Sequence, residues 1–320
     1  MYQNSKPVRL ITFLAVTIAV LTLAAELSAR EFLGLGTPPL SVKHPTIEYM
    51  FKPNQDIYRF GNHVFINQYG MRSENFPKTK VSPAELRIMV FGDSIVNGGN
   101  LTDQQELATT QLEVNLKEKL NKPVLVGNIS AGSWGPDNWL AYAQEYGLFE
   151  ADIIFLVISS HDYADNATFA ELNPNTHPTT PPFSALGEAF TRYLPRYLPS
   201  FPAAKAHSVK HTTPNPLAVN HGLDALQTFL VLAKSTGAKV YVIQHWTEPE
   251  LTVEKAEPGY YMIRDLCHKL DIPTYSTFSH YQQAMAKGSQ LYYDYIHINQ
   301  NGQAILEDMM LEITSDTQLH

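Results

Sequence analysis

The chain has 320 residues, of which 44% are hydrophobic, so it can bury the core of one large domain. Its formal net charge of −8 and its scattered Lys and Arg residues provide no basic surface, which argues against nucleic acid as a partner. Its single cysteine, Cys267, has no partner for an intrachain disulfide and is expected to be a buried structural thiol.

An apolar segment near the N-terminus predicts contact with a membrane. Lys6 and Arg9 precede an uncharged run at residues 10–25, a little shorter than the roughly 20 residues of a standard transmembrane helix. The run could be a signal peptide or a retained signal anchor, and the lack of a small-residue cleavage motif before Arg30 favours retention. We therefore interpret residues 1–30 as a signal anchor or transmembrane helix. The upstream positive charges then place the rest of the chain outside the cytoplasm, in the periplasm or at the cell surface.

Residues 31–84 combine strand and turn signals with polar and aromatic side chains. This stretch is too short to carry a core of its own. We interpret it as an extracytoplasmic lead-in rather than as an independent domain.

From residue 85 onward, apolar strands alternate with helices, the pattern of a parallel sheet covered on both faces. Residues 85–320 are therefore predicted to form an α/β three-layer sandwich with a central parallel sheet. In such sheets the active site lies beyond the carboxyl ends of the strands. We expect strands at residues 86–91, 124–129, 153–158, 239–244 and 273–275, and helices at residues 104–120, 137–146, 219–236, 258–270 and 301–314.

An insertion at about residues 163–216 separates the third and fourth strands and is dense in Pro and Tyr. A loop of this length is usually functional or disordered, and its aromatic content favours order. Because it begins at the carboxyl end of a strand, we interpret it as a lid or substrate platform. The alternative is a packing excursion without ligand contact.

Ser94 is the candidate nucleophile. The expected strand at residues 86–91 runs directly into Gly92-Asp93-Ser94. A glycine beside a serine at the end of a buried strand allows a sharp turn that exposes the hydroxyl. The tripeptide is weak alone and gains weight from the strand before it and the helix after it.

A second constellation, Asp294-Tyr-Ile-His297, precedes the last expected helix. A serine hydroxyl needs a base to take its proton, and an imidazole base needs a carboxylate to hold its tautomer and offset its charge. One short turn with Asp three residues before His supplies both groups. Ser94, His297 and Asp294 are therefore predicted to act as nucleophile, base and orienting acid.

Together the two motifs resemble the first and fifth sequence blocks of the GDSL/SGNH hydrolase superfamily, and the resemblance covers residues 86–314. It implies an SGNH-type, flavodoxin-like fold. It also implies an oxyanion hole in which main-chain amides donate hydrogen bonds to the oxyanion, the first of them from Ser94. The segment Asn-Ile-Ser-Ala-Gly132-Ser-Trp-Gly135-Pro-Asp-Asn resembles the family's glycine block. The second donor is then Gly132 or Gly135, with Ser133 also open.

The family's third block, usually Gly-x-Asn-Asp, falls on Ser159-Ser-His161-Asp162. His161 stands in the place of the asparagine, which is the main departure from the family pattern. An imidazole can donate a hydrogen bond to an oxyanion, more strongly as a cation and then with a dependence on pH. Asn166 is another candidate donor.

The remaining candidates for substrate contact are Asp93, Asn166 and Trp134. Trp134 is one of the tryptophans near strand ends, where a ring can stack on a sugar, although core packing is the more frequent role. In the lead-in, Arg59 and Arg72 belong to segments similar to those that precede the hydrolase domain in anchored bacterial relatives. Each arginine either approaches the substrate or pins the lead-in to the domain.

We expect neither a metal nor a cofactor. The histidines in or beside the insertion have no metal-ligand spacing and no cysteine partner: His177, His207, His211 and His221.

The resemblance implies a serine esterase or O-acyltransferase, and by analogy it suggests O-acetyl groups of an extracellular or cell-wall polysaccharide as the substrate. One alternative is a lipid esterase or lysophospholipase. Another is a catalytically silent scaffold that joins a membrane protein in a membrane or polysaccharide-export assembly. An intact serine, acid and base argue against the scaffold.

Overall fold

The computed structural model describes residues 6–194 and 216–319. Its centre is a parallel sheet in the order β6-β5-β7-β8-β9, which is 2-1-3-4-5 in chain order, the flavodoxin-like arrangement. Each expected strand is present within one residue of its expected bounds: β5 (Leu86–Gly92), β6 (Val124–Ser130), β7 (Ile153–Ser159), β8 (Lys239–His245) and β9 (Thr274–Ser276).

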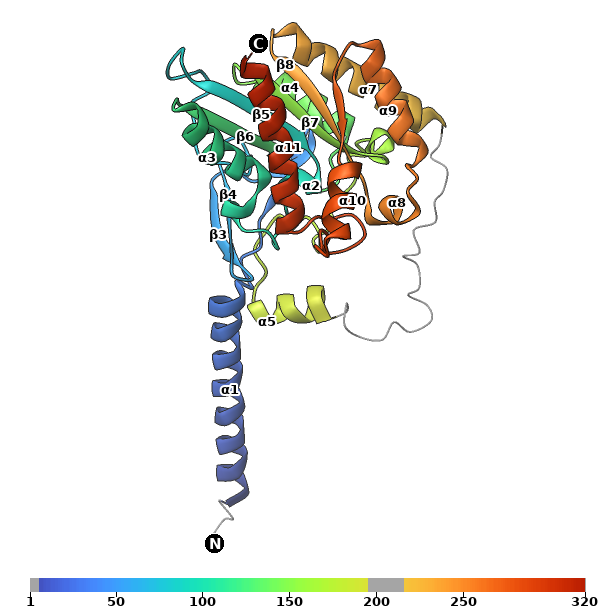
Figure 1. Cartoon of the computed structure of the whole chain (residues 1–320). Helices are drawn as coiled ribbons and strands as arrows, with labels where there is room; N and C mark the ends of the chain where they lie inside the picture. Colours follow the sequence, from blue (N-terminus) through green and yellow to red (C-terminus); the bar gives the residue numbers. More distant parts are fainter. Residues whose placement is uncertain (1–5, 195–215, 320) are drawn as a thin grey trace.

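Helices cover both faces of the sheet, which confirms the predicted three-layer sandwich (Figure 1). One face packs on α4 (Pro136–Tyr146), α7 (Pro216–Ser235) and α9 (Pro258–Lys269), and Cys267 is buried in that layer. The other packs on α3 (Ala108–Leu120), α10 (Phe278–Ala286) and α11 (Gln300–Leu319). The short helices α2 (Ser94–Asn97), α8 (Glu248–Val253) and α10 were not predicted, because each is too short to show a clear apolar period.

The first helix, α1 (Lys6–Leu33), projects from the domain (Figure 1) and contacts the rest of the chain near its C-terminal end. Its segment Val8–Leu33 is 26 residues long with a mean hydropathy of 2.3, and its most apolar window is not buried by any other part of the chain. By length and composition this segment can cross a membrane. A cleaved signal sequence and a retained anchor both have these properties.

The lead-in forms two antiparallel hairpins that pack on the domain. They are β1 (Ser41–His44) with β2 (Glu48–Phe51), and β3 (Gln55–Arg59) with β4 (Asn62–Ile66). Apolar lead-in side chains join the same core as the α4 and α7 face of the sheet: Ile47, Tyr49, Met50, Met71 and Phe76.

Arg59 and Arg72 pin the lead-in in place. Arg59 is fully buried, forms an ion pair with Glu188 of the insertion and donates to Gly34 O at 2.8 Å. Arg72 is 1% exposed and donates to backbone carbonyls of the loop after Ser94, at 2.5 Å for Asn97 and 2.6 Å for Thr102. Neither guanidinium is free to contact a substrate.

The described part of the insertion runs beside the lead-in towards α1. The backbone amides of Thr168 and Phe169 donate to Oε1 of Glu48, at 2.8 and 2.9 Å. Further along, α5 (Ala185–Glu188) continues into a π-helical turn, η3 (Ala189–Tyr193), next to α1. The rest of the insertion, with His207 and His211, lies outside the described residues, and its role as a lid or substrate platform stays a prediction.

Candidate active site

Ser94 stands on a sharp turn between β5 and α2. Asp93 caps α2, because its Oδ1 accepts a hydrogen bond from the Ile95 amide at 2.8 Å. Gly92 has to be glycine, since a Cβ there would lie 2.3 Å from Cγ2 of Val96. This local geometry brings Ser94 to the carboxyl end of β5, where ligands of open α/β sheets bind.

Ser94, His297 and Asp294 form a continuous chain of hydrogen bonds. Nε2 of His297 lies 3.0 Å from Oγ of Ser94, and Nδ1 of His297 lies 2.7 Å from Oδ2 of Asp294. Oδ1 of Asp294 also accepts the His297 amide at 2.8 Å. The carboxylate therefore holds the ring in the tautomer whose Nε2 accepts the Ser94 proton.

The electrostatics suit this role. Partial burial raises the pKa of Asp294, but hydrogen bonds from the backbone and ring of His297 outweigh burial and leave that pKa below its ordinary value. Asp294 is therefore ionised at neutral pH and can stabilise the imidazolium that forms when His297 takes a proton.

A buried histidine, His245, supports the turn at residues 294–297 that carries Asp294 and His297. Nε2 of His245, at the end of β8, donates to Ile296 O at 3.1 Å, and the Tyr293 amide donates to His297 O at 2.8 Å. Burial lowers the pKa of His245 to about 3, so its ring is neutral and keeps one nitrogen as an acceptor. His245 was missed from the sequence, where its position at a strand end is the only signal.

The amide of Ser94 is suited to an oxyanion hole, because Ser94 is the first residue of α2 and its amide has no acceptor within that helix. Gly132, in the loop between β6 and α4, has open space around it, with no atom within 4 Å of the place of a Cβ. This open space leaves room for a ligand beside the loop, and the Gly132 amide stays the predicted second donor.

Gly135, the alternative to Gly132, has a structural role instead. Its amide donates to Oδ1 of Asn138 at 2.9 Å at the start of α4. A Cβ at this position would stand 2.0 Å from the carbonyl oxygen of Asp165, so close packing requires glycine. The prediction of Gly135 as a donor is corrected on this ground, which leaves the amides of Gly132 and Ser133.

The oxyanion loop is held by distant parts of the chain. The Tyr49 hydroxyl, from the lead-in, donates to the Gly132 carbonyl. The ring of His177, from the insertion, packs on Tyr49 with 4.4 Å between centroids. Ser133 adopts a left-handed φ of 60°, a conformation that non-glycine residues rarely keep without support. Fixing the Gly132 carbonyl also fixes the amide of Ser133, because the two belong to one planar peptide group.

His161 lies at the site beside Asp162. Its Nε2 is 3.2 Å from Oδ1 of Asp162, and half of its side chain is exposed. Nε2 therefore faces the carboxylate, and a bond to an oxyanion requires either Nδ1 or a turn of the exposed ring. The oxyanion role of His161 stays a prediction.

Two buried acids stand behind the nucleophile. Burial raises the pKa of Asp93 to about 7, with a further contribution from Asp162, and burial also raises the pKa of Asp162 well above its ordinary value. Ligand atoms of Asp93, His161 and Asp162 lie within 4.8 Å of one another, a spacing that a cation could occupy. The expectation of no metal therefore also stays a prediction.

Of the three side chains predicted to contact substrate, Trp134 and Asp93 are buried and Asn166 is half-buried. Trp134 is 1% exposed and donates from Nε1 to a lead-in carbonyl at 2.9 Å. Nδ2 of Asn166 donates to two backbone carbonyls, at 3.1 and 2.9 Å, and Asp93 is 3% exposed. Trp139 and Trp246 are buried as well. The predictions for Trp134 and Asp93 are corrected, because these side chains pack and cap. Nδ2 of Asn166 is used within the protein, but its Oδ1 has no hydrogen-bond partner among the described residues, so a substrate contact through that oxygen stays a prediction.

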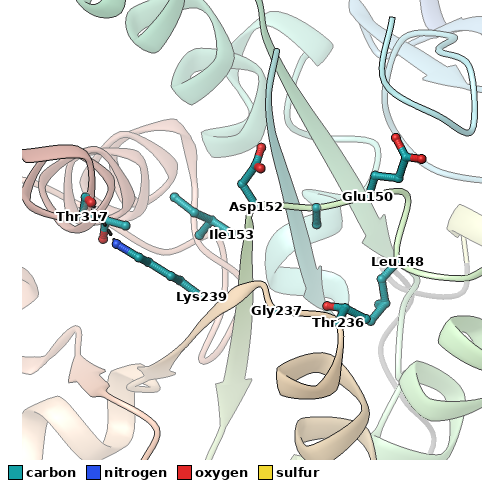
Figure 2. Close-up of a pocket in the computed structure, with 9 residues that line it drawn as sticks. Leu148, Glu150, Asp152, Ile153, Thr236, Gly237, Lys239 and Thr317 are labelled. Carbon is teal, nitrogen blue, oxygen red and sulfur yellow. Dashed lines mark hydrogen bonds between the residues drawn. The ribbon is translucent and has the colours of Figure 1, made fainter. Parts of the chain in front are cut away.

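A pocket at the amino-terminal end of the sheet lies away from the triad. Figure 2 shows Lys239 of β8 reaching Thr317 of α11, where its Nζ donates to the backbone carbonyl at 3.0 Å. Glu150 and Asp152 line the same pocket. It is at the opposite end of the strands from Ser94, so it has no part in the chemistry of the triad.

No protein-family model and no curated protein matches the chain. Among solved structures, a lipolytic G-D-S-L family member from Veillonella parvula is similar at 11% identity and a TM-score of 0.44, over 72% of this chain and 98% of that one. An acetyl xylan esterase is similar at 14% identity and a TM-score of 0.47, over 71% and 99%. A two-domain esterase active on acetylated mannans is similar at 13% identity and a TM-score of 0.48, over 74% and 50%. At these values the similarities carry no argument about function.

The chain's own features decide the type of site. The sequence blocks follow the family order, the sheet has the 2-1-3-4-5 strand order, and the serine, histidine and aspartate are hydrogen-bonded in sequence. The arrangement is that of a serine nucleophile with a histidine base and an orienting aspartate. His161 stands where the motifs that this chain resembles have an asparagine.

Proposed function

We propose that this chain is a serine esterase or O-acyltransferase of the GDSL/SGNH superfamily. The observation that carries the proposal is the hydrogen-bonded chain from Ser94 through His297 to Asp294. A silent scaffold has no need of a base within 3.0 Å of a serine hydroxyl and held there by a carboxylate.

In the proposed reaction, Oγ of Ser94 attacks the ester carbonyl while Nε2 of His297 takes the hydroxyl proton. The oxyanion accepts hydrogen bonds from the amides of Ser94 and of the Gly132–Ser133 loop. The protonated His297 returns its proton to the leaving alcohol, and an acyl-Ser94 ester remains. Attack by water on that ester gives hydrolysis, whereas attack by a sugar hydroxyl gives acyl transfer.

We propose O-acetyl groups of an extracytoplasmic polysaccharide as the substrate. The support is the openness of the site: the side chains of His297, Asp294 and His161 are 45%, 48% and 50% exposed. An open site admits a small acyl group carried on a bulky hydrophilic polymer. The apolar α1 helix, retained as an anchor, supports a place at the outer face of a membrane.

A lipid esterase is the second candidate, favoured by where the site lies. α11 begins three residues after His297, at the end of the domain from which α1 projects, and ends at the opposite pole (Figure 1). The catalytic end of the domain therefore faces the region that a membrane around α1 would fill. Turnover of short-chain against long-chain esters separates the two candidates, since an acetyl-specific enzyme loses activity as the acyl chain lengthens.

The test of the chemistry is Ser94→Ala in the full chain. We expect loss of turnover on an acetylated chromogenic ester and loss of labelling by a fluorophosphonate probe, with folding unchanged. Ser289→Ala, an exposed serine in the turn after α10, serves as the matched control and should keep its labelling. Labelling that survives in Ser94→Ala would remove Ser94 as the nucleophile, and no turnover or labelling of the native chain would favour the scaffold.

A further inference from the structure

The short helical segment at residues 183–194, which we call the interfacial segment, carries an apolar face with no partner among the described residues. Phe183 is fully exposed, Phe190 is 62% exposed and Leu194 is 38% exposed. Phe190 and Leu194 are four residues apart, so they share one side of the helix. Leu186 lies at the edge of that side and is partly buried against the cluster of Ala29, Leu35 and Ala185. Large aromatic side chains gathered on one exposed helix side usually mark an interaction surface.

The opposite side of this segment is fixed to the domain. Ala185 is buried, and the buried carboxylate of Glu188 accepts the Gly36 amide at 2.7 Å and pairs with Arg59. The apolar side therefore points away from the domain. Figure 1 shows the segment, labelled α5, lying across the domain end of α1.

One contact fixes the height of the segment along α1. The two carboxylate oxygens of Glu26, in α1, accept the amides of Ala185 and Leu186 at 2.8 and 2.9 Å. Glu26 is the first charged residue after the uncharged run at residues 10–25. A bilayer core needs roughly 20 helical residues, so a bilayer spanned by α1 ends close to Glu26.

The occupant of the apolar face follows from this placement. We propose that the interfacial segment lies on the outer surface of the bilayer that α1 spans, with Phe183, Phe190 and Leu194 at the boundary between headgroups and acyl chains. Aromatic and aliphatic side chains on one face of a helix bind membranes in this way. The proposal rests on retention of α1 as an anchor, which belongs to the proposed function, and not on the ester chemistry.

Further contacts connect the end of α1 to the catalytic end of the domain, so the placement of α1 and the interfacial segment also sets how that end is oriented to the bilayer. The Phe60 amide, next to Arg59, donates to Leu33 O at 3.0 Å, and Nδ2 of Asn62 donates to Asn100 O at 3.0 Å. The hydroxyl of Tyr293 donates to Leu101 O at 2.7 Å, in the same loop. Contacts thus lead from the end of α1 to the turn that carries His297. In this proposal the domain is attached to the bilayer at two places, the spanning helix α1 and the interfacial segment on the surface. Two attachments restrict rotation of the domain about α1.

The test places a fluorophore at single cysteines in the full chain, reconstituted in phosphatidylcholine vesicles, in a Cys267→Ala background. Phe190→Cys labelled with bimane should be quenched by lipids brominated on their acyl chains. Leu21→Cys in α1 is the positive control. Val81→Cys, an exposed site near the start of β5, is the negative control.

The outcomes separate cleanly. Quenching at 21 and 190 but not at 81 supports the proposal. Quenching at 21 alone shows an inserted anchor with the interfacial segment off the bilayer, and no quenching at 21 shows that no anchor is present; either result overturns the proposal. Fluorophosphonate labelling of Ser94 in the same vesicles reports the proposed chemistry independently of all three.

A second variant tests the role of Glu26 itself. Glu26→Ala removes both acceptors for the amides of Ala185 and Leu186. We expect quenching at 190 to fall while quenching at 21 is unchanged. Equal quenching at 190 with and without Glu26 would overturn the argument that this contact sets the height of the segment.

Discussion

At the scale of single residues, the catalytic chemistry and its support come from different parts of the sequence. Ser94 and His297 sit in motifs, whereas Tyr49, which holds the Gly132 carbonyl, lies in the lead-in. Nothing in the local sequence around Tyr49 indicates that contact. An oxyanion loop with a left-handed Ser133 depends on such support, because its backbone is not the one its residues prefer.

Tyr49→Phe removes only the hydroxyl that donates to Gly132. We expect kcat to fall about tenfold with little change in KM, because a displaced oxyanion donor weakens transition-state binding more than substrate binding. Steady-state kinetics on a short-chain ester measures this. Tyr58→Phe, at an exposed lead-in tyrosine, is the control. A twofold change or less in Tyr49→Phe would show that the loop does not need the contact.

Asp93→Asn should change how stability depends on pH. The pKa of Asp93 is raised from 3.8 to about 7, so the folded protein binds a proton there that the unfolded chain loses above pH 4. Its contribution therefore becomes less favourable as pH rises through this window. Asparagine can still cap α2 and carries no charge to bury.

We expect Asp93→Asn to match the native chain near pH 4 and to exceed it at pH 8 by up to about 4 kcal/mol, at about 1.4 kcal/mol for each pKa unit. Thermal unfolding of the full chain in detergent between these pH values measures the difference. A constant offset at all pH values would mean that the pKa of Asp93 is not raised.

At the scale of elements, the lead-in acts as a brace for the loop behind the nucleophile. Its contact is Arg72, whose guanidinium donates to Asn97 O and Thr102 O in the stretch between α2 and the next helical turn. A buried carbonyl that loses its donor costs about 1–3 kcal/mol. The strands of the sheet and the helices that cover it were predictable, because their apolar periods are local signals in the sequence. The contacts of Arg72 were not, because they join residues that become neighbours only when the chain folds.

Arg72→Lys should destabilise the chain by about 3 kcal/mol, because an ammonium cannot reproduce the fork of the guanidinium. The midpoint of thermal unfolding should fall by roughly 6–12 °C for a domain of this size. Arg264→Lys is the matched control, since Arg264 is exposed and contacts only near neighbours in the same helix among the described residues, Asp265 and the ring of Tyr261. Equal midpoints for the two variants would show that Arg72 is not a brace.

At the scale of the whole molecule, the sequence predicted the serine, histidine and aspartate that the structure brings together, and the structure shows what surrounds them. The triad could be predicted because each member belongs to a short motif at the end of a strand. The choice between Gly132 and Gly135, and the burial of Trp134, could not, because they depend on how Asp165 and Tyr49 pack against that loop. The sequence indicates the interfacial segment only as part of a long insertion, since a helix of two turns has too few residues to show an apolar period.

The contact between Glu26 and the interfacial segment has a consequence for how the enzyme meets its substrate. If α1 stays in the bilayer, the domain moves by lateral diffusion, and its reactive end samples a thin layer of constant depth. The number of ester groups within that layer, rather than their bulk concentration, then limits the rate. A polymer would be modified only where it passes close to the surface, so modification would follow the route of the chain as it leaves the membrane.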